Sequence, residues 1–205
     1  ITGEAGIGKT RLAEELGAWA ARQGITCART RAYAAEGRLS YAPLIEWLRT
    51  PALMATLARL DPVWRSELAR LLPELLTQQP ALPSPGPLTE YWQRQRFFEA
   101  LARGLLAGQA PLLLLIDDLQ WCDQETLEWL HFLLRFDAKA RLLVVGTARS
   151  EELPANPALL TLVRALQGGR QLHEFALPPL DAAEVGKLAV TISTRALAVA
   201  ETMHL

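Results

Sequence analysis

The first ten residues contain the feature that most limits what this chain can fold into. Gly3-Glu4-Ala5-Gly6-Ile7-Gly8-Lys9-Thr10 matches the pattern G-x-x-x-x-G-K-[ST] over its full length. Its glycines let consecutive backbone N–H groups turn inward around phosphate oxygens, because a Cβ atom would clash in so tight a turn. The pattern therefore predicts a strand, a phosphate-binding loop and a helix whose dipole adds positive potential at its first turn.

Two side chains of this loop have the spacing needed for triphosphate chemistry. Lys9 is placed to reach the β- and γ-phosphates, and the Thr10 hydroxyl is placed to ligate Mg²⁺. We therefore expect the chain to bind a nucleoside triphosphate. The expected nucleotide-binding residues are Gly3, Glu4, Ala5, Gly6, Ile7, Gly8, Lys9, Thr10 and Arg11.

Strands and helices alternate along the rest of the chain. Residues 112–116 and 142–146 are short apolar runs, which are typical of strands buried on both faces. Further strands are expected at 25–33 and 172–177. Amphipathic helices are expected at 9–23, with Leu12, Leu16, Trp19 and Ala20 on the buried face, and at 157–167. Such alternation indicates a parallel sheet with helices on both faces.

The middle of the chain predicts a helical region rather than part of the sheet. Helical patterning over 41–76 is interrupted by four prolines, so several short helices are expected there. Residues 78–88 hold four prolines and a glycine, which predicts an exposed loop. Three side chains are expected to cap the helices that follow: Thr89, Asp123 and Asp181.

A pair of carboxylates follows the first apolar run, at Asp117 and Asp118. The carboxyl ends of parallel strands form the ligand-binding edge of a sheet, so both side chains are expected beside the phosphate loop. Asp117 would hold Mg²⁺ through water, and Asp118 would orient or deprotonate the attacking water. Two aspartates after leucines are more often a turn or a helix cap. Their combination with a complete phosphate loop favours the catalytic interpretation.

The second apolar run leads into Arg149 at the same predicted edge. Its guanidinium could contact the γ-phosphate, and the alternative is an exposed arginine that starts a loop. We therefore assign Lys9, Asp118 and Arg149 to catalysis, and Thr10 and Asp117 to the metal. Gln120 is interpreted as an ordinary loop amide, and Trp121 as packing.

Arg164 and Arg170 end the helix that precedes the last predicted strand. In ring-forming ATPases an arginine from such a position reaches the nucleotide of a neighbouring subunit. The simpler explanation, cations that complement the end of a helix, is favoured here.

Composition excludes several other classes of function. The formal net charge of −1 and the pI near 6.4 give no general attraction to nucleic acid or anionic lipid. Two cysteines far apart in the sequence predict free thiols in a reducing compartment, and the three histidines have no metal-ligand spacing. No apolar run is long enough to cross a bilayer. We expect a cytoplasmic protein without membrane contact, and both ends of the sequence look like those of a fragment.

The segments GEAGIGKT, LLLLIDDLQWCD and VVGTARSEEL, in this order, resemble the AAA-type ATPase domain of the STAND class of signal-transduction NTPases. The most similar versions occur in large bacterial transcriptional regulators, either LuxR-type or with a bacterial transcriptional activator domain, and beside nucleotide cyclases. The D-D-L-Q-W-x-D continuation is the most specific part. Two further segments, 41–44 and 177–181, also fit the family. With them the resemblance covers nearly the whole chain.

The resemblance implies an α/β fold, a P-loop NTPase three-layer α/β/α sandwich with a mostly parallel five-stranded sheet. The ATPase core would span 1–180 with a helical insertion at about 41–108, and 181–205 would begin a helical lid. The strand at 142–146 would lie between the phosphate-loop strand and the Asp117 strand. Asp117 becomes the Mg²⁺-associated acid, Asp118 the catalytic acid and Arg149 the sensor of the nucleotide. ATP and Mg²⁺ are the implied cofactors.

The leading functional hypothesis is a slow regulatory ATPase switch whose partners are the regulatory domains of the same, longer chain. DNA would be contacted only through a domain outside this sequence. One alternative resembles origin-recognition proteins, a homo-oligomeric ATPase that loads onto DNA with arginines acting between subunits. Another is a nucleotide-binding scaffold without hydrolysis, and a small-molecule kinase is disfavoured because no acceptor-binding cluster is visible.

Overall fold

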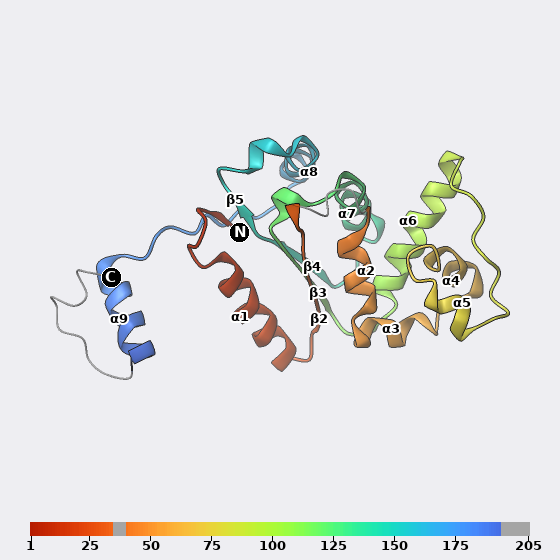
Figure 1. The fold of residues 1–205 in the computed structure, drawn as a ribbon, viewed down its shortest axis with the longest axis horizontal. Helices are drawn as coiled ribbons and strands as arrows, with labels where there is room; N and C mark the ends of the chain where they lie inside the picture. The colour runs from red at the N-terminus through yellow and green to blue at the C-terminus, as the bar shows by residue number, and fades with distance from the viewer. Residues whose placement is uncertain (35–39, 194–205) are drawn as a thin grey trace.

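The computed structural model describes residues 1–34 and 40–193 and forms a three-layer α/β/α sandwich, as expected from the sequence (Figure 1). The described strands are β1 (Thr2–Gly3), β2 (Thr26–Arg31), β3 (Leu112–Asp117), β4 (Leu142–Gly146) and β5 (Ala148–Arg149). Every pairing between them is parallel. The α/β class and the parallel sheet are therefore confirmed.

The strand order agrees with the prediction for the strand at 142–146. β3 lies between β2 and β4, and β5 continues the path of β4 after Thr147. β1 pairs with β5. Ile1 also makes hydrogen bonds on both sides of Thr147. Its amino group donates to the Gly146 carbonyl at 2.7 Å, and its carbonyl accepts from Ala148 N at 2.9 Å. The β4–β5 strand therefore separates the phosphate-loop strand from β3.

The strand expected at 172–177 is reduced to one bridge, between Thr2 and Ala176. Thr2 N donates to the Phe175 carbonyl at 2.9 Å, and Leu177 N donates to the Thr2 carbonyl at 2.8 Å. Most residues of 171–180 are exposed, Phe175 at 60%, so this segment lacks the buried apolar contacts that hold β3 in the sheet.

The two faces of the sheet are covered differently. Leu113 and Leu115 point toward α1 (Lys9–Arg22), whereas Leu112, Leu114 and Ile116 belong to the larger core on the opposite face. This division follows from the period of two along a strand. The larger core is closed by α2 (Ala42–Arg49), α7 (Gln124–Phe136) and α8 (Pro157–Gly168).

The face of α1 that meets the sheet is made of small residues, which corrects the predicted stripe. Ala13 and Ala20 are buried, while Leu12 and Trp19 are 39% and 51% exposed. A Cβ atom on Gly17 would lie 2.9 Å from Leu115 Cδ1. The helix therefore approaches the sheet too closely for large side chains at its contact face.

The prolines of the middle region begin separate helices, as predicted. After α2 come α3 (Pro51–Leu57), α4 (Pro62–Leu68), α5 (Glu74–Gln78) and the long α6 (Tyr91–Leu106). Pro43, Pro51 and Pro62 each lie in a first turn, where a missing N–H costs no hydrogen bond. The cap of α6 is Glu90 rather than Thr89, because Glu90 and Gln93 form a reciprocal capping box.

The remaining helices confirm two of the predicted caps. Asp123 caps α7 by accepting from Thr126 N at 2.9 Å, and Asp181 accepts from Glu184 N at 2.8 Å before α9 (Ala182–Ser193). β4 is less buried than predicted, since Leu143 is 55% exposed on the face that α1 covers only in part. The end of the predicted lid, 194–205, lies outside the described residues.

Among the described helices, none is both long enough and apolar enough to cross a membrane.

Candidate active site

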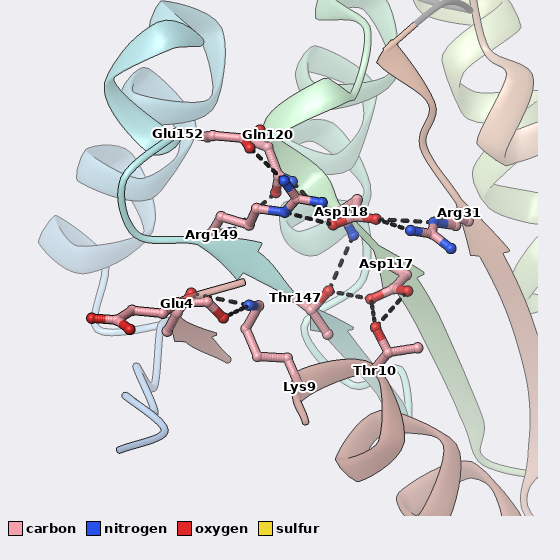
Figure 2. A network of polar contacts seen from close by, with 11 residues as sticks. Glu4, Lys9, Thr10, Arg31, Asp117, Asp118, Gln120, Thr147, Arg149 and Glu152 are labelled. Atoms are coloured by element: carbon pink, nitrogen blue, oxygen red, sulfur yellow. Dashed lines mark hydrogen bonds and ion pairs between the residues drawn. The ribbon is translucent and has the colours of Figure 1, made fainter. Parts of the chain in front are cut away.

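The phosphate loop and the ends of β2, β3 and β4 meet at one edge of the sheet (Figure 2). Within the loop, Gly6 and Gly8 have φ angles of 79° and 105°, a backbone region that side chains with a Cβ rarely adopt. Gly8 is also the N-cap of α1. These glycines therefore turn the loop over the start of the helix, where backbone N–H groups favour anions.

Lys9 extends back over the loop instead of into solvent. Its Nζ donates to the carbonyls of Gly3 at 3.0 Å and Glu4 at 2.6 Å, and the residue is 7% exposed. The loop residues 4–6 are exposed. The ammonium group is therefore held at the mouth of the loop, within reach of a phosphate that binds there.

Thr10 and Asp117 face each other across the edge of the sheet. Thr10 Oγ1 lies 3.0 and 2.9 Å from the two carboxylate oxygens of Asp117. Asp117 is 3% exposed, and its Oδ1 also accepts from the hydroxyl of Thr147. The alternation of β3 explains the placement, since Asp117 follows Leu113 and Leu115 on the face that carries α1.

These oxygens fit Mg²⁺, which prefers hard oxygen ligands and commonly takes one or two from the protein and the rest from phosphates and water. In the ranges 1–34 and 40–193, no group of three or more His, Cys, Asp or Glu side chains forms a separate metal site. Thr10 and Asp117 would supply only two ligands from the protein, and this number suits a metal ion that binds together with a nucleotide.

Asp118 is buried and surrounded by hydrogen-bond donors. Its backbone has a φ of 57°, a left-handed conformation that departs from the alternation of β3. Arg31 donates to Oδ2 from Nε at 2.9 Å and from a terminal nitrogen at 2.6 Å, and Gln120 Nε2 donates to Oδ1 at 3.0 Å. The backbone N–H of Asp118 donates to Thr147 Oγ1 at 3.1 Å. The carboxylate is therefore fixed in position and its charge is paired.

Arg31 is the main site residue that the sequence interpretation missed. It ends β2 and is in register with Asp117 on β3. The pKa of the Arg31 guanidinium is raised above its ordinary value, and the hydrogen bond to Asp118 is the largest cause. The available signal was the position of Arg31 at the carboxyl end of a predicted strand, the same argument that singled out the aspartates.

Arg149 lies at the expected edge, next to the second aspartate. It donates to Glu152 at 2.7 Å, its Nε lies 3.9 Å from Asp118 Oδ1, and its guanidinium is 4.9 Å from the centre of the Trp121 ring. Trp121 also packs against the larger core, as its interpretation as a packing residue predicts. Gln120 is more than a loop amide, because it bonds to Asp118 and accepts from Arg149 N at 3.2 Å.

Other predicted residues lie away from this network. The Arg11 side chain is 76% exposed and pairs with Glu15 at 2.5 Å, away from the loop residues that would contact phosphate. Arg164 and Arg170, near the end of α8, are exposed. Thr147, which the sequence interpretation did not single out, joins the two aspartates through its hydroxyl group.

The phosphate loop, the acid at the end of β3 and the parallel strand order define a nucleotide-binding α/β domain. The sequence model of the AAA ATPase domain matches residues 1–145, which include the phosphate loop, β3 and all of β4 but its last residue. The chain belongs to this family.

No curated protein matched the chain. Among solved structures, it is similar to the Aeropyrum pernix Orc1 protein in complex with DNA, with 18% sequence identity and a TM-score of 0.46. The match covers 94% of this chain and 42% of that one, so the chain spans less than half the length of the Orc1 chain.

Proposed function

We propose that this domain binds and hydrolyses ATP as the regulatory switch of a larger signalling or transcriptional regulator of the STAND class. One observation carries the proposal. A buried Asp118 directly follows an Asp117 that faces Thr10 of the phosphate loop. Binding and hydrolytic groups thus share one edge of the sheet.

Nucleotide binding would replace contacts that the loop now makes with itself. The triphosphate would lie along the backbone N–H groups of residues 4–10, and Lys9 would exchange the carbonyls of Gly3 and Glu4 for β- and γ-phosphate oxygens. Thr10 and Asp117 would hold Mg²⁺. When bound, the metal supplies positive charge that offsets the charge of the phosphates.

Hydrolysis would place water in line with the γ-phosphorus. The water oxygen forms a bond to phosphorus as the bond between phosphorus and the ADP oxygen breaks. Asp118 accepts a hydrogen bond from the water and orients it, and the proton leaves with the inorganic phosphate. Arg149, close to Asp118, is placed to offset negative charge as the γ-phosphoryl group transfers.

The hydrogen bonds around Asp118 support slow turnover. Donors occupy both carboxylate oxygens, so an attacking water must compete with Arg31 and Gln120 for a hydrogen bond to Asp118. A regulatory domain whose output is a conformation needs a state in which hydrolysis is held back.

We further propose that DNA is contacted only through another part of the protein. The free thiols of Cys27 and Cys122 support a cytoplasmic location.

Single-turnover hydrolysis of ATP by Asp118→Asn tests the proposal. The variant removes the carboxylate charge with little change of shape, so we expect hydrolysis to fall at least roughly 100-fold with ATP affinity retained. Asp61→Asn, an exposed aspartate before α4, is the matched control and should hydrolyse at the unmodified rate. Equal rates of hydrolysis in the two variants would show that Asp118 is not the catalytic acid, and no hydrolysis by the unmodified domain would support the nucleotide-binding scaffold instead.

A further inference from the structure

A cavity of about 470 Å³ lies between α6 and α7, and none of its lining residues belongs to the candidate active site. The two helices pack against each other beyond the sheet (Figure 1). Pockets of about 300–1,000 Å³ lined by apolar and aromatic groups with a few polar ones are the usual sites for small molecules. This cavity has the size of such a site.

Aromatic side chains form the apolar part of the cavity. Phe98 of α6 meets Phe132 of α7 edge to face at 5.7 Å, and Phe132 lies 5.5 Å from Phe136 one helical turn later. Phe132 and Phe136 are partly buried against the larger core, and both also line the cavity. A flat aromatic molecule can pack against these rings.

The charged groups around the cavity leave a surplus of positive charge. Arg94 pairs with Glu128 and lies over the Phe98 ring at 5.0 Å, so its charge is already matched. Arg135 also lines the cavity, and within residues 1–34 and 40–193 it makes no ion pair. His131, one turn before Arg135 on the same helix, adds a second donor.

We propose that this cavity binds a small aromatic carboxylic acid, with the ring against Phe98 and Phe132 and the carboxylate on Arg135. The charge surplus selects an anion over a neutral molecule or a cation, because a guanidinium binds a carboxylate through two parallel hydrogen bonds. The volume suits one or two fused rings. Binding of this acid does not require ATP hydrolysis.

Calorimetry with 2-naphthoate and its neutral analogue 2-naphthol tests the proposal. We expect 2-naphthoate to bind with a Kd at least about 10-fold lower than 2-naphthol. Arg135→Gln should remove this preference. Arg59→Gln, which removes an exposed arginine outside the cavity, should keep it.

Phe132→Leu separates the ring contact from the charge. It should weaken both probes by a similar factor, at least about threefold, because each loses the same aromatic neighbour. Equal affinity of the unmodified chain for the two probes, or no binding of 2-naphthoate at millimolar concentration, would overturn the proposal. So would an equal loss in Arg59→Gln and Arg135→Gln, which would indicate non-specific attraction to a positive surface.

Discussion

The guanidinium of Arg31 donates two hydrogen bonds to a single oxygen of Asp118, at 2.9 and 2.6 Å (Figure 2). The pair joins the carboxyl ends of β2 and β3, and its two members differ in environment. The side chain of Arg31 is 45% exposed and that of Asp118 is 8% exposed. The carboxylate proposed to orient water is thus held by a group that solvent can reach.

Replacement of Arg31 by Gln is expected to raise the rate of ATP hydrolysis several-fold. The charged donor on Oδ2 disappears, so this oxygen of Asp118 is free to accept a hydrogen bond from water. Single-turnover measurements at saturating ATP check this, with Arg29→Gln as the control on the same strand, since Arg29 pairs with Glu14 outside the site. A fall to the rate of Asp118→Asn would mean instead that Arg31 positions Asp118 for catalysis.

Replacement of Lys9 by Ala is expected to weaken ATP binding roughly 10- to 100-fold, the range expected when hydrogen bonds to a charged group are lost. The ammonium group now lies on the carbonyls of Gly3 and Glu4, at the mouth of the loop. Calorimetric titration with ATP gives the affinity. Arg22→Ala, in the exposed last turn of the same helix, removes one positive charge away from the loop and should bind ATP as before. Unchanged affinity in Lys9→Ala would contradict the assignment of the loop.

The sequence predicted the part of the site that depends on local pattern and strand direction. Asp117 follows an apolar strand and Thr10 ends the loop motif, so the parallel sheet alone brings them together. Arg31 and Thr147 lie at the same edge for the same reason. They were missed because an arginine or a threonine after a strand is common, and only the fold shows which carboxylate it meets.

Helix α1 illustrates a second limit of sequence interpretation. Hydrophobicity alone selected Leu12 and Trp19 for the buried face, yet the helix turns its small residues toward β3. Close packing depends on both surfaces in contact. The small size of Gly17 therefore marks the buried face of α1 only once Leu115 is known to lie opposite it.

Substitution of Gly17 by Val is expected to destabilise the domain by about 1–3 kcal/mol, the usual cost of overpacking a close contact. The added atoms would meet Leu115 Cδ1, which already lies 2.9 Å from an ideal Cβ position. Denaturant unfolding measures the loss. Ala18→Val, exposed on the next position of the helix, should cost no more than about 0.7 kcal/mol of helix propensity. Equal losses would show that the contact has room to adjust.

Replacement of Asp123 by Ala is expected to cost about 1–2 kcal/mol of stability, the upper part of the range for an N-cap. Its carboxylate accepts from Thr126 N at 2.9 Å and from Tyr41 N at 3.2 Å, so it also ties the start of α2 to α7. Asp61 offers a matched comparison, because it precedes α4 without a side-chain cap bond. Thermal unfolding should therefore show a smaller shift for Asp61→Ala, and an equal shift would argue against the cap.

Replacement of Thr147 by Val tests whether the two aspartates are positioned together. Valine keeps the shape but removes the hydroxyl that donates to Asp117 and accepts from Asp118 N. A carboxylate that loses an orienting donor holds a metal less well, so the affinity for ATP with Mg²⁺ should fall several-fold. The affinity for ATP in EDTA should not change, because the contacts of the phosphate loop remain. An equal loss of ATP affinity under both conditions would indicate that Thr147 supports the phosphate loop. No loss of affinity with Mg²⁺ would show that Thr10 and Asp117 hold the metal without help from Thr147.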